Sequence, residues 1–271
     1  MKTLEGKLAL VTGAGSGIGR ATAIALADKG ARVVACDLAP ARVDAIASTL
    51  GGKCALAKTV DVSKKDPMRA LADEVHERLG PLDVLVNNAG VGHSGGILDS
   101  TLDDWEWVIS VNLWGVVHGC HFFVPKMVER GSGQVVNVAS GFGLVAGPNV
   151  APYCTTKFAV VGMSESMRAE LAPHGVGVSA ICPGLINTEI VKDGRFADEK
   201  MRTGVVAAFH RRGRPPEQVA HAVLRAIRHD LAVVPVGAEA WVGWISKRVS
   251  PSLTSFVGRR VERAARKSVG V

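Results

Sequence analysis

Tyrosine is nearly missing from this sequence of 271 residues, which has one tyrosine beside seven phenylalanines and five tryptophans. Repeats, low-complexity segments and Pro/Ser-rich linkers are missing too, so nothing divides the chain into several domains. The five cysteines are odd in number, and none is spaced as C-x-x-C. This usage excludes a disulfide framework and a cysteine zinc site, and it favours reduced thiols and a cytoplasmic location.

Long apolar runs are also lacking. No run approaches the roughly 18 residues needed to cross a bilayer, so we do not expect a membrane-spanning protein. A strand pattern begins at Lys7, which leaves no room for a signal peptide before it. With 47% apolar and 21% charged residues, the composition is typical of a globular protein with a large core.

Excess positive charge is absent from the first three quarters of the chain. Residues 1–194 carry 17 Lys and Arg against 19 Asp and Glu, whereas residues 195–271 carry 15 against 6. Apolar and basic residues at helical spacing predict a basic amphipathic extension over 239–271. It either packs on the rest of the protein or contacts an anionic membrane surface peripherally. No nucleic-acid binding is expected, because no base-reading motif accompanies the charge.

Short β-branched segments alternate with amphipathic segments along the chain. The predicted strands are Leu8–Thr12, Arg32–Asp37, Ala55–Val60, Leu82–Val86, Gln134–Ala139, Val176–Cys182 and Ala232–Pro235. The predicted helices span 18–29, 40–50, 64–79, 102–129, 153–172 and 216–229. Because the strands barely alternate with polar residues, they are buried on both faces. We therefore predict an α/β, doubly wound Rossmann fold with about seven parallel strands and helices on both faces.

The first predicted strand ends in a glycine-rich turn, T-G-A-G-S-G-I-G over 12–19, which opens directly into a helix pattern. Glycines let the backbone turn tightly and let a pyrophosphate approach the N–H groups at the helix N-terminus. The glycines at 13, 17 and 19 follow G-x-x-x-G-x-G rather than G-x-G-x-x-G. The position after a strand predicts a dinucleotide site.

The second predicted strand ends in Asp37, whose carboxylate can accept hydrogen bonds from both hydroxyls of an adenosine ribose. It would also repel a 2′-phosphate, and Leu38 stands where a phosphate-binding arginine would be expected. NAD is therefore favoured over NADP. Arg42 lies nearby and keeps NADP open, and a helix N-cap is the alternative role for Asp37.

The one tyrosine, Tyr153, stands four residues before Lys157. At that spacing two helical residues share a face. A phenol ordinarily titrates near about pH 10, and a fixed cation nearby lowers its pKa toward the range useful for proton transfer. Because Y-x-x-x-K also arises by chance, the other motifs decide what the pair does.

Together these motifs resemble the single-domain branch of the short-chain dehydrogenase/reductase family, over about residues 5–190. Further matches at family spacing are Asp61-Val62, N-N-A-G at 87–90, Asn112, Ser140 thirteen residues before Tyr153, and P-G-x-x-x-T at 183–188. The resemblance implies an NAD-dependent oxidoreductase that interconverts a secondary alcohol and a ketone by hydride transfer. It implies one dinucleotide-binding and catalytic domain over 1–238, with a substrate loop at about 189–214.

The resemblance also assigns roles. Tyr153 would be the general acid and base, Lys157 would lower its pKa and hold the nicotinamide ribose, Ser140 would bind the substrate oxygen, and Asn112 would hold a water. These four are the implied catalytic residues. The implied cofactor contacts are Gly13, Ser16, Gly17, Ile18, Gly19, Asp37, Asp61, Val62, Asn88, Ala89, Gly90, Tyr153, Lys157, Pro183, Gly184, Ile186 and Thr188.

The expected substrate wall is mostly apolar and favours a hydrophobic small molecule. Its residues are Ser140, Phe142, Leu144, Ile190 and Phe196. No metal site is indicated, because the histidines lack a ligand constellation. Family members are usually homodimers or homotetramers through the helices matching 102–129 and 153–172. The alternatives are a non-catalytic dinucleotide-binding protein and a membrane-peripheral lipid-binding protein, and the complete catalytic set argues against the first.

Overall fold

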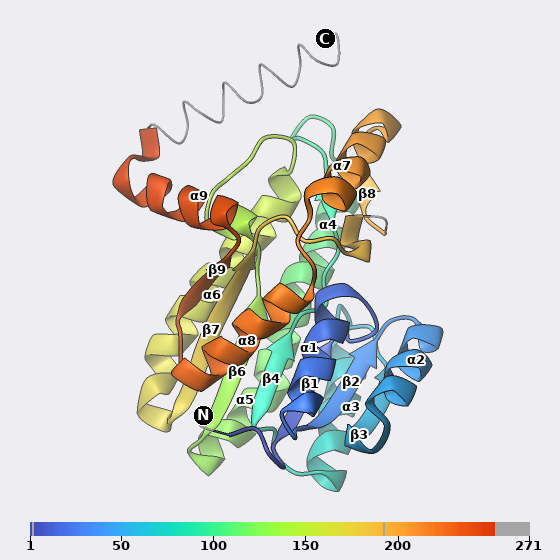
Figure 1. The fold of residues 1–271 in the computed structure, drawn as a ribbon, viewed down its shortest axis with the longest axis vertical. Coiled ribbons are helices and arrows are strands. Elements are labelled where there is room, and N and C mark those ends of the chain that lie inside the picture. The colour runs from blue at the N-terminus through green and yellow to red at the C-terminus, as the bar shows by residue number, and fades with distance from the viewer. Residues whose placement is uncertain (2, 192, 253–271) are drawn as a thin grey trace.

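The computed structural model describes residues 1, 3–191 and 193–252. Within them, seven parallel strands form one sheet in the order β3-β2-β1-β4-β6-β7-β9 (Figure 1). The strands are β1 (Leu8–Thr12), β2 (Arg32–Asp37), β3 (Cys54–Thr59), β4 (Val84–Asn87), β6 (Gly133–Val138), β7 (Val176–Pro183) and β9 (Val233–Val236). The strand order reverses between β1 and β4, which is the switch point of a doubly wound sheet. The predicted fold is confirmed.

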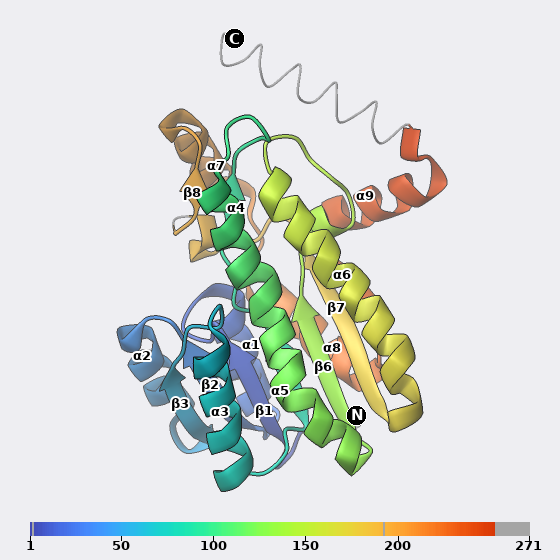
Figure 2. The same ribbon diagram turned by 180° about the vertical axis from the view of Figure 1, so that it is seen from behind.

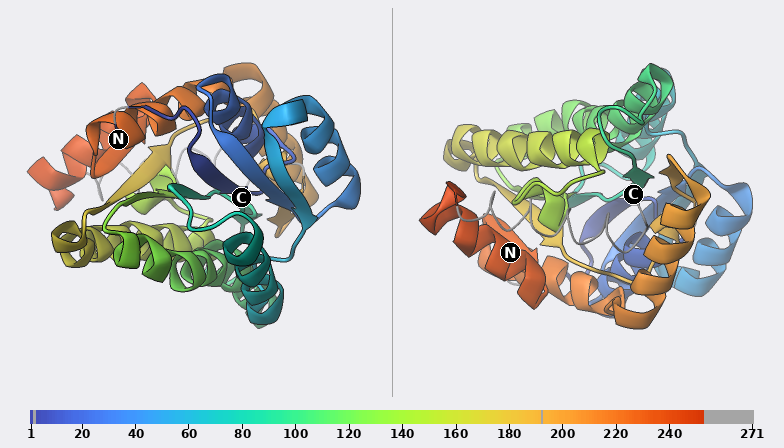
Figure 3. Two further views of the ribbon diagram at one scale, coloured as in Figure 1. Left: turned by 90° about the horizontal axis from the view of Figure 1, so that it is seen from below. Right: turned by 90° about the horizontal axis from the view of Figure 1, so that it is seen from above.

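Helices cover both faces of this sheet, as the view from behind in Figure 2 and the end views in Figure 3 show. One face carries α1 (Gly17–Asp28), α2 (Pro40–Leu50) and α8 (Glu217–His229). The other carries α3 (Lys65–Arg78), α4 (Leu102–Ile109), α5 (Gly115–Arg130) and α6 (Ala151–Leu171).

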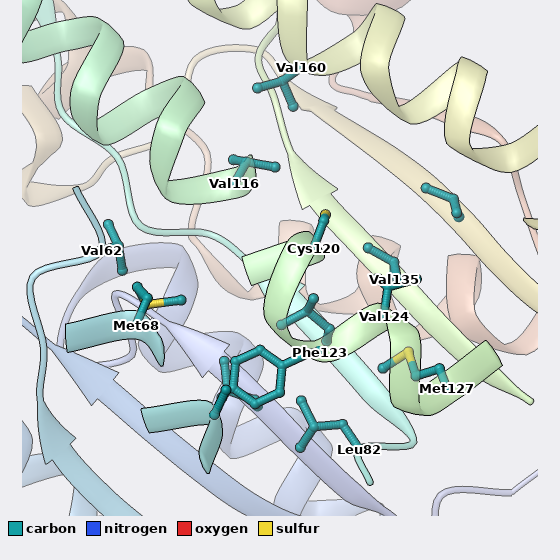
Figure 4. Packing of buried hydrophobic residues seen from close by; sticks show 14 of the residues in the cluster. Val62, Met68, Leu82, Val116, Cys120, Phe123, Val124, Met127, Val135 and Val160 are labelled. Carbon is teal, nitrogen blue, oxygen red and sulfur yellow. The ribbon is translucent and has the colours of Figure 1, made fainter. Parts of the chain in front are cut away.

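Each strand supplies two hydrophobic cores at once. In β1, Leu8 and Leu10 face the core under α3, α5 and α6, whereas Ala9 and Val11 face the core under α1, α2 and α8. All five β1 residues are buried, which explains why the strand sequences are apolar without alternation. Figure 4 shows the first of these cores, where Phe123 of α5 lies among aliphatic side chains.

The predicted helix over 102–129 is interrupted in the structure. A π-helical turn, Ser110–Trp114, separates α4 from α5 and contains Asn112. Within this stretch of 29 residues, an 18-residue window has mean hydropathy 1.3, so by length and composition the helix could cross a membrane, and 44% of that window is buried. This corrects the expectation that no segment reaches that length. Here α5 packs on β4 and β6 as a core helix.

Several elements near the carboxyl edge of the sheet were not predicted. A second parallel sheet pairs β5 (His93–Ser94) with β8 (Arg195–Phe196), and α7 (Glu199–Arg212) follows it. After β9, α9 (Ala238–Val249) forms the first part of the predicted amphipathic extension and packs on the turn at 141–143, which follows β6. Residues 253–271 of that extension lie outside the described residues. The boundary between a domain over 1–238 and an extension over 239–271 therefore stays a prediction.

Candidate active site

The glycine turn after β1 is tied to the loop after β4 by a small hydrogen-bond network. The Asn88 side chain donates from Nδ2 to the carbonyls of Thr12 (2.9 Å) and Gly13 (3.3 Å). In return, Thr12 Oγ1 accepts from the N–H groups of Asn88 and Ala89, both at 3.0 Å. Thr12, 2% exposed, was not among the predicted site residues, although its place in the T-G motif marked it. The network fixes the shape of the turn.

The turn has no room for larger side chains and leaves its helix end open to an anion. Gly13 has φ +63°, and a Cβ there would lie 2.9 Å from the Ala89 Cα. A Cβ on Gly19 would collide with the Gly13 carbonyl. Ser16 is the N-cap of α1 and, among the described residues, makes no capping hydrogen bond through its side chain. The N–H groups of the first turn, through Ile18, therefore fit a dinucleotide pyrophosphate.

Asp37 lies at the end of β2 beside this turn. Its carboxylate accepts from the N–H groups of Gly15 (3.0 Å) and Ala39 (3.1 Å), and the residue is 7% exposed. The N-cap of α2 is Ala39, so the alternative role of Asp37 as a helix N-cap is wrong. The position fits an adenosine ribose next to the pyrophosphate turn.

The other predicted cofactor residues lie along the same carboxyl edge of the sheet. After β3, Asp61 accepts from the Ser63 N–H (2.9 Å), and Val62 is 7% exposed. At the end of β7, Pro183 and Gly184 lead to Ile186, which is 3% exposed, and to Thr188. A Cβ on Gly17 would lie 3.1 Å from the Thr188 side chain. The segment after β7 therefore lies against the glycine turn at 12–19, which we also call the phosphate turn because its N–H groups fit a pyrophosphate.

Ser140, Tyr153 and Lys157 come together at the end of β6. The Ser140 hydroxyl hydrogen-bonds the Tyr153 phenol, and its oxygen also accepts from the Phe142 N–H (3.1 Å). Lys157, 3% exposed, donates from Nζ to the Val138 carbonyl (3.1 Å). Its Nζ lies 5.6 Å from the centroid of the Tyr153 ring. The helical spacing in α6 thus places phenol and ammonium on one face, as the sequence predicted.

Asn112 lies close by but uses both ends of its amide on the loop after Gly90. Its Oδ1 accepts from the Val91 N–H (2.8 Å) and its Nδ2 donates to the Val91 carbonyl (3.0 Å). A Cβ on Gly90 would lie 3.1 Å from Asn112 Oδ1 and 3.6 Å from Lys157 Nζ. The π-helical turn thus presents this buried amide beside the lysine. Its role in holding a water stays a prediction.

Burial moves the two titratable groups in opposite directions. It raises the pKa of Tyr153 to about 12, against the lowering effect of the Ser140 hydrogen bond. It lowers the pKa of Lys157 to about 8. The pKa of Tyr153 is therefore raised overall in this structure, because loss of hydration outweighs the interactions that lower it. The role of Lys157 in lowering that pKa stays a prediction. At neutral pH the phenol keeps its proton.

The predicted substrate residues are only partly brought to the site. The Phe142 ring is 38% exposed and meets the Tyr153 ring edge-on, with centroids 6.4 Å apart. Ile190 lies against Gly92, and Phe196 is half-buried in β8. Leu144, 6% exposed, belongs to the core under α5 and α6. This corrects its predicted place in the substrate wall, because a neighbouring turn points it inward.

A family model described as short chain dehydrogenase matches residues 7–199. The chain belongs to the short-chain dehydrogenase family. The resemblance in the motifs is thereby confirmed, and the protein is placed among oxidoreductases that share this site architecture.

Two curated relatives of this short-chain dehydrogenase show the range of the family. The oxidoreductase EphD of Mycobacterium tuberculosis is 38% identical over an alignment of 263 positions, which covers 93% of this chain and 44% of EphD. The chain thus spans less than half the length of that relative. The D-threitol dehydrogenase of Mycolicibacterium smegmatis is 41% identical over 189 residues, 69% of this chain and 73% of the relative.

A solved structure of a short-chain dehydrogenase from Burkholderia phymatum in complex with NAD superposes with a TM-score of 0.86. The two chains are 30% identical, and the match covers 93% of this chain and 96% of the other. The similarity therefore extends over the whole sheet and both helix layers.

Because the ammonium of Lys157 is buried, we expect the substitution Lys157→Met to stabilise this short-chain dehydrogenase. With a folded pKa of about 8 against an ordinary 10.5, the cost of burying the charge is full below pH 8 and disappears as pH rises to 10.5. We expect the variant to raise the free energy of unfolding at pH 7 by roughly 1–3 kcal/mol. Urea unfolding at pH 7 and pH 9.5 should show this advantage shrinking. An advantage equal at both pH values would mean that Lys157 does not titrate in this window.

Proposed function

We propose that the protein is an NAD-dependent oxidoreductase that interconverts a secondary alcohol and a ketone. The single observation that carries this proposal is the contact of Ser140, Tyr153 and Lys157 at the sheet edge that also holds the glycine turn. Membership of the short-chain dehydrogenase family supports the reaction class. The proposed roles follow from the chemistry of the three side chains.

A nicotinamide dinucleotide held at the glycine turn would supply the hydride for ketone reduction and would accept it in alcohol oxidation. Ser140 donates its hydroxyl hydrogen to the substrate oxygen and so holds it beside Tyr153. The phenol, which carries its proton at neutral pH, donates that proton to the oxygen as the carbonyl is reduced. In the reverse direction the phenolate accepts it, and the neighbouring ammonium of Lys157 stabilises that charge.

The preference for NAD over NADP rests on Asp37. A carboxylate that is 7% exposed, at the end of β2, suits the two hydroxyls of a ribose and repels a phosphate in the same place. The Burkholderia phymatum structure, which holds NAD, supports a nicotinamide dinucleotide as the cofactor.

An apolar substrate is proposed from three apolar side chains, of which Phe142 contacts Tyr153. Phe142 meets the tyrosine ring, and Ile190 and Phe196 lie on the segment that faces the loop after β4. Apolar walls with one polar end suit a lipophilic alcohol that presents its oxygen to Ser140. The second candidate is a polyol, because one relative is named for D-threitol.

Turnover of lipophilic secondary alcohols with NAD tests the reaction and the substrate class together. We expect NADH formation with long-chain or cyclic secondary alcohols, and little with D-threitol, because hydroxyls facing Phe142 would lose water without gaining partners. Higher turnover of D-threitol would contradict the apolar pocket. No turnover of any alcohol, or of the matching ketones with NADH, would favour the non-catalytic alternative.

Tyr153→Phe in the same assay tests the proton carrier. Loss of the hydroxyl should lower kcat by about 10²–10⁴ while NADH binding is retained, because little volume is removed. Thr155→Ala is the matched control, since Thr155 is exposed on the same helix and bonds only the Ala151 carbonyl among the described residues. A Tyr153→Phe enzyme as fast as the control would refute the role of the phenol.

Contact with an anionic membrane is a second proposal, and it rests on α9. Val242, Ile245 and Val249 are 66%, 51% and 80% exposed at helical spacing, next to Lys247 and Arg248. Such a face is typical of helices that lie in a membrane interface. The predicted cytoplasmic location and homo-oligomeric assembly also stay proposals.

Sedimentation with vesicles of mixed anionic and zwitterionic lipid tests this contact. The full chain should sediment with the vesicles, and a chain lacking 239–271 should not, because the apolar and basic groups are then gone. Binding should weaken as salt is raised, since charge contributes to it. A full chain that stays in the supernatant would leave α9 with a packing role alone.

A further inference from the structure

The segment after β7 closes over the carboxyl edge of the sheet and is held at two places. We call residues 189–191 and 193–198 the closing segment. On the side of α4, the Arg195 N–H donates to the Gly92 carbonyl (3.1 Å) and the Ala197 N–H donates to that of Ser94 (2.8 Å). The Arg195 guanidinium also bonds Asp104 (3.2 Å). These contacts anchor one half of the closing segment to the loop after β4 and to α4.

On the other side the closing segment reaches α2, beside the proposed adenosine position. Asp193 accepts from the Arg42 guanidinium at 2.8 Å, across 151 residues of sequence. Arg42 lies in the first turn of α2, directly after the strand that ends in Asp37. The closing segment is therefore held to α4 at one end and to α2 at the other.

Arg42 and Asp37 flank the same residue of the phosphate turn. A Cβ on Gly15 would collide with the Arg42 Cβ and would lie 2.9 Å from Asp37 Oδ2. Arg42 is thus placed beside the carboxylate proposed to hold the adenosine ribose. Of the described basic side chains, it is the one brought to that carboxylate by the turn, so it is the natural cation for a phosphate on the ribose.

Carboxylates of this protein already surround the Arg42 guanidinium and serve as its anionic partners. Asp193 hydrogen-bonds it, and Asp193, Asp37 and Glu189 together raise the pKa of the guanidinium. An arginine engaged with a carboxylate must release it before it can bind a phosphate as a fork. A 2′-phosphate entering here would also face Asp193 itself. A ribose with a free 2′-hydroxyl requires neither change.

We propose that Asp193 is a determinant of cofactor choice, which acts by holding Arg42 away from the adenosine 2′-phosphate and thereby favours NAD over NADP. The inference rests on the proposed preference for NAD and adds a second residue to it. Asp37 repels the phosphate directly, whereas Asp193 removes the cation that would attract it. The sequence alone does not reveal this role, because Asp193 lies 151 residues from Arg42 and belongs to the segment expected to contact substrate.

The alternative is that the pair only fastens the closing segment, as exposed ion pairs commonly do with little effect on stability. Arg42 and Asp193 side chains are 38% and 53% exposed, so the stability effect alone cannot separate the two readings. Binding of ligands with and without a 2′-phosphate can separate them. A fastening role predicts equal effects on ligands with and without that group, whereas the proposed role predicts a gain confined to ligands that carry it.

Calorimetric binding of adenosine 2′,5′-bisphosphate and of AMP to the full chain makes this comparison. Asp193→Asn should bind the bisphosphate about tenfold more tightly than the original protein, because Arg42 is released to it, with no matching gain for AMP. Adding Arg42→Gln should abolish the gain, and high salt should reduce it. Asp44→Asn, an exposed acid two residues from Arg42 on the same helix, is the matched control for charge.

Three results would overturn the proposal. They are no gain for the bisphosphate in Asp193→Asn, an equal gain in Asp44→Asn, and a gain that persists when Arg42 is also replaced. Steady-state rates with NAD and NADP separate this failure from that of the proposed function. An original protein that prefers NADP refutes the proposed preference itself. One that prefers NAD, with an Asp193→Asn variant that gains nothing for NADP, refutes the role of Asp193 alone. Thermal unfolding of each variant confirms that it is folded.

Discussion

A buried lysine ammonium next to a half-buried tyrosine is the constraint on which the rest of the site depends. Both lose hydration, which raises the pKa of Tyr153 to about 12 and lowers that of Lys157 to about 8. Removing such a pair from water costs free energy, so its polar atoms need hydrogen-bond partners in the protein. The Val138 carbonyl accepts from the lysine, and the Ser140 hydroxyl bonds the phenol. The resting phenol holds a proton that it can give to a substrate oxygen.

The parallel sheet brings the two halves of the chemistry to one edge. Every strand of the main sheet runs in the same direction, so the loops after β1, β2, β4, β6 and β7 gather at their carboxyl ends. The bonds between Thr12 and Asn88 lock the phosphate turn to the loop that leads to Asn112. The closing segment then spans from Arg42 to Asp104. The segments that we propose to set cofactor choice, line the substrate and carry the proton are therefore connected by hydrogen bonds.

Sequence reasoning predicted what depends on local pattern. The seven strands were placed within two residues at each end, because unbroken apolar runs fill two cores. The phosphate turn, Asp37 and the spacing of Tyr153 and Lys157 are also local. Features set by tertiary packing were missed. Strands of two residues, such as β5 and β8, show no period, and the inward turn of Leu144 is invisible in a sequence. The direction of the tyrosine pKa depends on burial, and the partner of Arg42 lies 151 residues away.

Because the chain has one tyrosine, the ultraviolet absorbance of phenolate reports the titration of Tyr153 and nothing else of its kind. Absorbance recorded just after a rapid jump to alkaline pH reads the folded protein before it unfolds. The account predicts an apparent pKa near 12, well above the ordinary value of 10.0, in the protein without ligand. A phenol that ionises at or below the ordinary value would contradict the proton-holding tyrosine on which the proposed chemistry rests.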